Sequence, residues 1–545
     1  MTSAWLAVGT YCVLMILFAI WARRDVGRDD ESYYLAGRSL AGPILLATMA
    51  ATNFSAFTVY GASGAAYRIG LSFLPIMAFG TGFMAVSMYA LGKRARALSA
   101  KHGAITAPEM IFGQTGSKQA QRIMASVLVI ATIPYLALQP RAAGLVVSAL
   151  FGGPEWIGAV LVTILVVAYT LTGGLKAVVR TDIAQGLIAL ILLWVGLALV
   201  VNDSGGLQTA MDSLAVSQPA LLGREGIYTL LIWSCTLLLW FFADPMFPQL
   251  YQRLCAAESD EDIGFMAKAY PAIAWLAFLP PILIGALGHL EFSGLDRAGS
   301  DNILPMQIME SGGAWFGGLI LVAGLAALMS TMDSQLLATG SLVTRDLLGT
   351  ENSGQSRRDM VIVALAVLGL VLSLWSNLSI LDLGLLAFSM YAVLFPSVYL
   401  AAYLEGLDGR AVIASVLSGE AMVFLAVEYP AFYSGWWVEP VGPAMPTVVV
   451  PSLVVAIVVL FGVNHVLSNR SLSEVVSSVL PERSRMAPTI VLLAVFLLAH
   501  DYWWWEENAT WLLGLPVWIW WAAALSAVQT GIMSRMTNDG GRWGI

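Results

Sequence analysis

The chain has 545 residues, of which 58% are hydrophobic and 11% are charged, and its formal net charge at pH 7 is −8. Soluble globular proteins carry roughly 25% charged residues, so this composition excludes a soluble fold and predicts an all-α polytopic membrane protein. The small negative charge gives no reason to expect nucleic acid as a partner. Three cysteines, Cys12, Cys235 and Cys255, provide neither a disulfide framework nor the spacing of a metal site.

Apolar runs of about 20 residues predict fifteen membrane-spanning helices in chain order. Their approximate bounds are 3–22, 41–64, 70–92, 121–149, 155–172, 183–202, 227–250, 268–290, 313–341, 360–376, 379–402, 409–428, 447–466, 487–502 and 511–530. No basic residue precedes the first run, and Arg23 and Arg24 follow it directly. This order does not fit a cleavable signal peptide and favours an N-terminus outside the cell.

The distribution of basic residues supports this topology. With the N-terminus outside, 23 of the 27 Lys and Arg residues fall on the inner side; the four others are Arg68, Arg141, Arg224 and Arg297. The C-terminus is then expected inside. No connection between spans is long enough for a soluble catalytic domain, so we expect a multi-pass protein of the plasma membrane that moves something across it.

Two predicted spans carry interruptions at corresponding places. The second contains the polar stretch 51–55, and the seventh contains Asp244 and Pro245, with Pro248 shortly after. Asn and Ser compete for backbone hydrogen bonds and Pro removes them, so each stretch can break a helix. The interval of five spans fits a transporter built from two inverted five-helix repeats. Taken singly, each interruption is also consistent with a simple packing kink.

The ninth span carries a cluster of oxygen atoms. Ala327, Ser330, Thr331 and Ser334 share one helical face, and Asp333 lies beside them. Hydroxyls without thiols or imidazoles suit a hard cation such as Na⁺. The cluster therefore predicts an ion site at membrane depth.

These motifs are similar to those of a known family. They are 34–38 (YLAGR), 51–55 (ATNFS), 173–177 (GGLKA) with 181–182 (TD), 252–253 (QR), and 326–331 (AALMST) followed by 333–334 (DS). Spread over residues 1–405, they make the chain resemble the sodium/solute symporter family, which includes sodium/proline, sodium/galactose and sodium/pantothenate carriers.

The resemblance implies a LeuT-like fold and alternating access coupled to Na⁺. Residues 41–205 would form the first five-helix repeat and residues 225–405 the second, inverted repeat. Residues 1–40 would form a leading helix with the first cytoplasmic loop, and residues 406–545 additional C-terminal helices. We expect the protein to function as a monomer.

The resemblance also implies the ion sites. The main Na⁺ site would use the carbonyls of Ala51, Phe54 and Ala327 and the hydroxyls of Ser330 and Thr331. A second Na⁺ site or exit path would use Ser55, Asp182, Asp333 and Ser334, where Asp333 strengthens cation binding or takes up a proton. Alternatively, Asp182 and Asp333 pair with Lys176 or Arg180 at the cytoplasmic rim.

The expected solute site adjoins the two breaks, and it comprises Phe57, Thr58, Met77, Gln139, Arg141 and Asp244. Its few polar groups disfavour a sugar. Arg141 is open to three interpretations: it binds a carboxylate of the solute, pairs internally with Asp244, or extends to the outer interface. The cargo is expected to be a small organic anion, such as a monocarboxylate, or an amino acid.

Two other functional classes occur among membrane proteins of this composition. Residues 61–64 match the GxSG motif of intramembrane proteases, but the four His residues all fall at span ends or in loops, which argues against an enzyme. A membrane sensor that binds the solute and signals through a partner is the alternative to a carrier.

Overall fold

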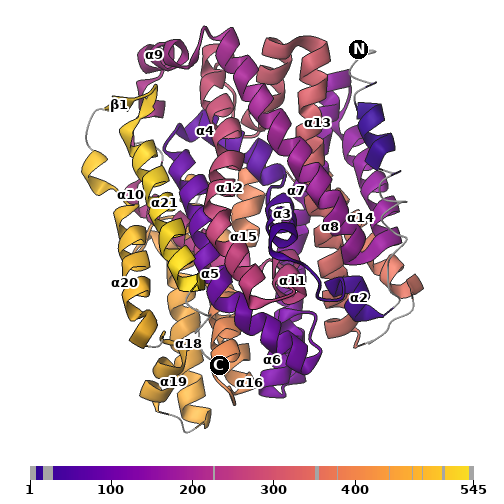
Figure 1. The fold of residues 1–545 in the computed structure, drawn as a ribbon, viewed down its shortest axis with the longest axis vertical. Coiled ribbons are helices and arrows are strands. Elements are labelled where there is room, and N and C mark those ends of the chain that lie inside the picture. The colour runs from indigo at the N-terminus through magenta and orange to yellow at the C-terminus, as the bar shows by residue number, and fades with distance from the viewer. Residues whose placement is uncertain are drawn as a thin grey trace.

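The computed structural model describes residues 6, 8–15, 17, 29–224, 228–349, 355–376, 378–440, 442–468, 471–481, 483–505 and 510–538. Its α-helices in chain order are α2 (Asp30–Leu35), α3 (Gly42–Asn53), α4 (Ala62–Ile69), α5 (Phe73–His102), α6 (Ala107–Thr115), α7 (Lys118–Phe151), α8 (Glu155–Asp203), α9 (Leu207–Ser217), α10 (Leu230–Ala243), α11 (Pro248–Ala256), α12 (Asp260–Leu287), α13 (Ile303–Ser341), α14 (Gln355–Trp375), α15 (Ile380–Tyr403), α16 (Gly409–Glu428), α17 (Ala431–Ser434), α18 (Val449–Ser468), α19 (Leu472–Val479), α20 (Arg483–Leu498) and α21 (Val517–Asn538). Most of the long helices run along the long axis of the molecule (Figure 1), which is therefore a helical bundle.

Within the described residues, ten helices are long and apolar enough to cross a membrane, or twelve if each of two bent helix pairs counts as one span. The shorter apolar helix Glu155–Leu171 is the first part of α8. A polytopic helical membrane protein is thereby confirmed. The total of fifteen spans and the direction of the termini stay predictions, since half of the first span, 3–22, falls outside the described residues.

The C-terminal region differs from the prediction at one place. The last span was expected to begin at residue 511, but Trp511–Leu512 (β1) and Leu515–Pro516 (β2) form an antiparallel hairpin, and α21 begins at Val517. Gly514 in the hairpin turn has φ 80°, a conformation that glycine adopts without steric cost and that an α-helix excludes. The apolar run therefore begins six residues before the helix does.

The two bent pairs coincide with the predicted interruptions. α3 meets the π-helical turn η2 (Phe57–Gly61) and α4 at 61°, and α10 with the 3₁₀ turn η4 (Asp244–Met246) meets α11 at 57°. Phe54 leaves the helical region with ψ 83°, and Phe247 leaves it with ψ 121°. Pro245 and Pro248 lack the N–H groups that would continue α10. Both helices are thus broken rather than gently curved.

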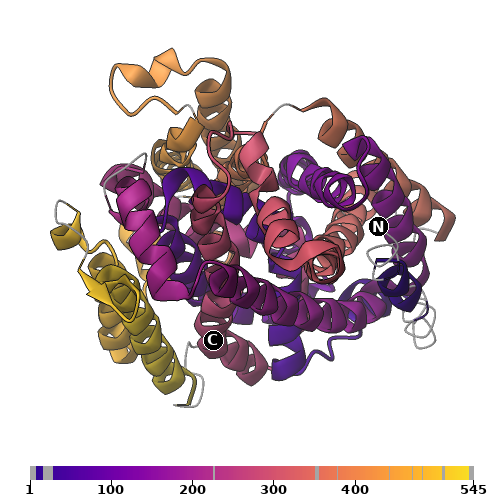
Figure 2. The ribbon, with the colours of Figure 1, turned by 90° about the horizontal axis from the view of Figure 1, so that it is seen from above.

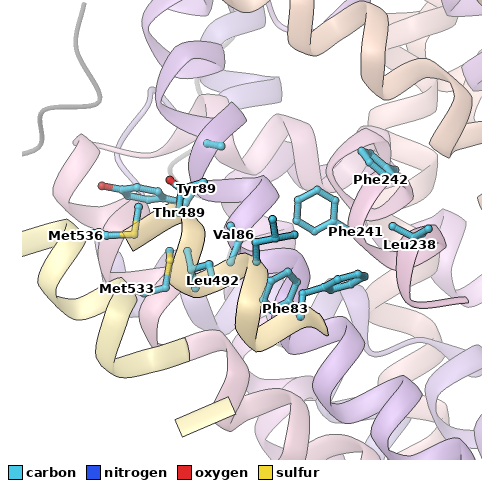
Figure 3. A pocket seen from close by; sticks show the side chains of 13 residues that line it. Phe83, Val86, Tyr89, Leu238, Phe241, Phe242, Thr489, Leu492, Met533 and Met536 are labelled. Atoms are coloured by element: carbon cyan, nitrogen blue, oxygen red, sulfur yellow. The ribbon is translucent and has the colours of Figure 1, made fainter. Parts of the chain in front are cut away.

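The C-terminal helices α20 and α21 form one edge of the bundle (Figures 1 and 2). Between this edge and helices α5 and α10 lies an apolar crevice of about 240 Å³, into which side chains such as Phe83, Phe241 and Met533 project (Figure 3). Charged side chains are missing from its lining, all of which belongs to the described residues. The crevice is therefore unsuited to an ion or a polar solute.

Candidate ion and solute site

The hydroxyl cluster of α13 faces the break between α3 and η2. The Ser330 hydroxyl donates to the carbonyls of Ala51 (2.8 Å) and Ala327 (2.9 Å). The Thr331 hydroxyl donates to the carbonyls of Thr52 (2.9 Å) and Ala327 (3.2 Å). Five oxygen atoms from two helices that are far apart in the sequence thus gather at one buried point.

The break itself supplies two of these carbonyls. In an uninterrupted helix, the N–H groups of Ser55 and Ala56 would donate to the carbonyls of Ala51 and Thr52. Instead, Ser55 N–H donates to the Asn53 carbonyl (3.0 Å), and Ala56 N–H donates to Gln139 Oε1 (3.1 Å). The released carbonyls are therefore available to α13.

The Phe54 carbonyl, the other expected ligand from this break, accepts no hydrogen bond from α13 within the described residues. The N–H groups of Thr58 and Val59 both donate to the Ser55 carbonyl, at 3.0 and 3.2 Å, rather than to Phe54. Neither Ser330 nor Thr331 donates to the Phe54 carbonyl, whereas Thr331 does donate to Thr52. Thr52 therefore joins Ala51, Ala327, Ser330 and Thr331 at the site, a contact that the sequence did not predict.

A buried ion pair lies next to this point. Asp182 of α8 accepts hydrogen bonds from Arg253 (2.7 Å), Thr48 (2.6 Å) and Thr52 (3.0 Å). The side chains of Asp182 and Arg253 are both fully buried. The alternative prediction that Lys176 or Arg180 provides the partner of Asp182 is wrong, because Arg253 of α11 takes that place.

Asp333 and Ser334 belong to the same cluster. Arg253 also donates to the Ser334 hydroxyl (2.7 Å), which lies 3.2 Å from Asp333 Oδ1. Asp333 is fully buried, and its Oδ2 lacks a hydrogen-bond partner among the described residues. The cluster thus holds two carboxylates and one guanidinium, so one negative charge is uncompensated while both carboxylates are ionised.

Ser55 is not part of this cluster. Its hydroxyl oxygen lies 3.1 Å from the N–H of Phe57 and 3.4 Å from the Tyr135 hydroxyl, and both groups donate to it. These contacts hold the start of η2 against α7. The expectation that Ser55 lies with Asp182, Asp333 and Ser334 is not met in this structure.

A small cavity lies between the two breaks. Its volume is about 20 Å³, and its lining is Asn53, Phe57, Thr58, Met77, Thr81, Tyr135, Trp240, Asp244, Phe247, Phe278 and Phe388. Four of the six residues expected at the solute site therefore lie together: Phe57, Thr58, Met77 and Asp244. Asn53 Nδ2 reaches Asp244 Oδ2 at 3.4 Å and so connects the first break to the second.

Gln139 and Arg141 lie elsewhere. Gln139 supports the first break through Ala56, as described above. Arg141 donates to the carbonyl of Ser376 at 2.7 Å, in the connection that precedes α15. The predicted pair of Arg141 with Asp244 is therefore wrong, because the two side chains are engaged at different places.

A further buried carboxylate lies on the predicted outer side. Asp301, in the connection between α12 and α13, accepts a hydrogen bond from the N–H of Ile380 at the start of α15 (2.8 Å) and lies 4.0 Å from Arg68 of α4. Burial raises the pKa of Asp301 to about 6, although the Ile380 N–H and the Arg68 charge both act to lower it. This carboxylate links three segments that come from both predicted repeats.

Both the sequence and the fold of this chain are similar to those of known membrane transporters. A model of the "Sodium:solute symporter family" matches residues 33–419. The chain belongs to the sodium:solute symporter family. The sodium/pantothenate symporter of Escherichia coli is 25% identical over 451 residues, covering 80% of this chain and 92% of the relative. The osmoregulated proline transporter OpuE of Bacillus subtilis is 28% identical over 436 residues, covering 77% of this chain and 88% of the relative.

Solved structures show the same fold. A Na⁺-coupled sialic acid symporter superimposes with a TM-score of 0.66 at 16% identity, covering 83% of this chain and 97% of that one. Membership of the family makes this chain a sodium-coupled transporter of the plasma membrane, with Na⁺ as its coupling ion, and not an enzyme.

Proposed function

We propose that this symporter imports a small solute together with Na⁺, and that the main Na⁺ site is the point where α13 meets the first break. The site would use the carbonyls of Ala51, Phe54 and Ala327 and the hydroxyls of Ser330 and Thr331, as predicted, with the Thr52 carbonyl in addition. One observation supports it above all: both hydroxyls point at carbonyls that the break has released from their helix. Such oxygens are ready to coordinate a hard cation.

A second cation would bind beside Asp333. Two fully buried carboxylates face a single guanidinium, and an uncompensated charge at membrane depth is costly. A second Na⁺, or a proton on Asp333, would remove that cost. Asp182, Asp333 and Ser334 would form this site together with Arg253, whereas the Ser55 hydroxyl is held by Phe57 and Tyr135.

The solute would bind in the cavity between the breaks. This cavity adjoins the main ion site through Asn53, which lies one residue from Thr52, so occupation of one site affects the other. Organic anions and amino acids are the candidate cargoes, and the two curated relatives are named for pantothenate and proline. With about 20 Å³ the cavity has room for roughly one water molecule, so the lining side chains must move apart before a solute enters.

Binding of radioactive sodium to the purified protein tests the ion site. Replacing Ser330 by Ala removes one oxygen ligand of the ion. Because an interaction between a polar group and an ion contributes strongly to binding, the Na⁺ affinity should fall about tenfold or more. Ser389→Ala is the matched control, because Ser389 is an equally buried serine of α15 whose hydroxyl bonds only its own helix. Equal sodium affinity in Ser330→Ala and the wild type would contradict the assignment.

A sensor that does not transport remains the functional alternative, and the relatives named above give it no support, since each is named as a carrier. Exchange of labelled for unlabelled solute in proteoliposomes separates the two. A carrier shows this counterflow, and a pure sensor shows none.

A further inference from the structure

Asp244 is a carboxylate without a cation beside it. It is 3% exposed, and its one side-chain hydrogen bond within the described residues comes from Asn53 Nδ2 at the long distance of 3.4 Å. Across the described part of the chain, none of the ion pairs formed by Lys, Arg or His involves Asp244. Without a cation, such a carboxylate is neutralised by a proton; when it is ionised, a cation that enters the cavity is its natural partner.

Aromatic rings enclose the same cavity. The ring centroids of Phe57, Trp240 and Phe388 lie 5.2 to 5.6 Å from one another. Tyr135 and Phe247 extend the group, with centroids 4.9 and 5.0 Å from that of Phe388. Ring faces carry negative charge density and attract cations, most strongly those that are poorly hydrated.

The cavity offers little to an anion. Arg141, which would have paired with a solute carboxylate, is bound to the Ser376 carbonyl and does not line the cavity. An ionised Asp244 would repel an anionic solute, and a protonated one would provide no positive charge for it. A monocarboxylate therefore finds neither a counter-ion nor a favourable field here.

The hydroxyls of the cavity are placed to accept hydrogen bonds from a solute rather than to donate them. The Thr58 hydroxyl donates to the Asn53 carbonyl, and the Tyr135 hydroxyl donates to Ser55 Oγ. Each keeps its lone pairs but has given its hydrogen to the protein, which again disfavours an anion. The aromatic lining favours an ammonium whose hydrogens are replaced by carbon, because such a cation is poorly hydrated.

We infer that the cotransported solute carries an alkylated ammonium group, which Asp244 neutralises and the rings of Phe57, Trp240 and Phe388 surround. This inference rests on the proposed function, since it describes the cargo of the same carrier. It selects, within the amino-acid class, N-alkylated compounds such as cyclic or methylated amino acids, and it rejects plain monocarboxylates.

Thermal unfolding of the full-length purified protein with candidate solutes tests the inference. Glycine betaine and L-proline should raise the unfolding temperature in Na⁺ but not in K⁺, whereas lactate should not raise it. Stabilisation by lactate equal to that by glycine betaine would overturn the inference and leave the proposed function intact. If Na⁺ alone gave no stabilisation over K⁺, the ion site would fail instead.

Two variants show whether the stabilisation by glycine betaine depends on Asp244 in particular. Asp244→Asn keeps the shape of the side chain and should weaken glycine betaine binding by about tenfold or more. Asp346→Asn is the control, because Asp346 is equally buried but lies in the π-helical turn after α13, η7 (Leu342–Leu347), where it accepts hydrogen bonds from Thr106 and Gln121. Unchanged affinity in Asp244→Asn would overturn the inference.

If Asp244→Asn does not fold, variants of the aromatic residue Trp240 test the inference independently. Trp240→Leu should weaken glycine betaine binding about tenfold, and Trp240→Phe should restore most of the affinity, because the ring face returns. If leucine and phenylalanine gave the same affinity as tryptophan, the rings would have no part in binding and the inference would be wrong.

Discussion

At the scale of single residues, the ion site depends on which atoms the hydroxyls of Ser330 and Thr331 face. Each hydroxyl donates to a carbonyl of the first broken helix in this structure. When a cation binds, the same oxygens can turn their hydrogens away and coordinate it together with those carbonyls. The same oxygens therefore bond one another in the absence of a cation and act as its ligands in its presence.

Thr331 allows a test in which shape is held constant. Thr331→Val keeps the branched side chain and removes the oxygen, so the concentration of Na⁺ needed for half-maximal stabilisation should rise about tenfold. Thr331→Ser keeps the oxygen and should remain close to the wild type. The two variants behaving alike in a sodium titration of the unfolding temperature would mean that the Thr331 hydroxyl is not a ligand.

Asp333 tests the second cation. If the uncompensated charge binds a second Na⁺, solute uptake should depend on the Na⁺ concentration with a Hill coefficient of about 2. Asp333→Asn should reduce this Hill coefficient to about 1, because the variant leaves Asp182 and Arg253 as a neutral pair. The measurement is the initial rate of solute uptake at increasing external Na⁺ concentrations. An unchanged sodium dependence in Asp333→Asn would show that Asp333 does not hold a coupled Na⁺.

The sequence allowed part of this site to be predicted. Ala327, Ser330 and Thr331 share a face through helical periodicity alone, and the structure brings them together with Ala51. The contact of Arg253 with Asp182 joins two helices 71 residues apart, and no local pattern encodes such a distance. Thr52 was missed for the same reason, since its role depends on where the Ala56 N–H group points.

At the scale of secondary structure elements, the first break is held open by Gln139. Its side chain takes the N–H of Ala56, which would otherwise return to Thr52. Gln139→Leu should therefore weaken Na⁺ binding although Gln139 does not touch the ion, and a buried N–H without a partner should cost about 1–3 kcal/mol of unfolding free energy. Sodium titrations of the unfolding temperature measure both effects, and a variant equal to the wild type in both would contradict this role.

Asp301 predicts how pH acts on the outer connection. Its pKa in the folded protein, about 6, lies above the ordinary value near 3.9. Ionisation therefore costs stability in the folded state, and the stability present at low pH is lost as pH rises through about 6. Asp301→Asn cannot ionise, so it should gain roughly 2–3 kcal/mol relative to the wild type between pH 4 and 7. Unfolding temperatures of the two proteins across this range should separate as pH rises; parallel curves would contradict the prediction.

The broken elements were predictable because their causes are local. Pro245 and Pro248 remove hydrogen bonds wherever they occur in a helix, and Asn53 with Ser55 competes for them. The hairpin at 511–516 was not foreseen, because tryptophan and leucine are as apolar in a strand as in a membrane helix. Hydropathy alone does not distinguish the two.

At the scale of the whole molecule, the two breaks act as one unit. Asn53 of the first reaches Asp244 of the second, α13 closes the ion site against α3, and Arg253 of α11 joins α8 to α13. The family and the helical bundle were foreseeable from the motifs. The identity of the cargo was not, because Arg141 looked like a solute ligand in the sequence and lies against Ser376 in the fold.

Uptake of radiolabelled glycine betaine into proteoliposomes tests the central claim that solute movement is coupled to Na⁺. One Na⁺ entering across about 100 mV provides roughly 2.3 kcal/mol, and a tenfold Na⁺ gradient adds about 1.4 kcal/mol, so the solute should accumulate on the order of several hundredfold. We predict that this accumulation collapses when K⁺ replaces Na⁺ and in Ser330→Ala. Accumulation that persists without Na⁺ would contradict the account.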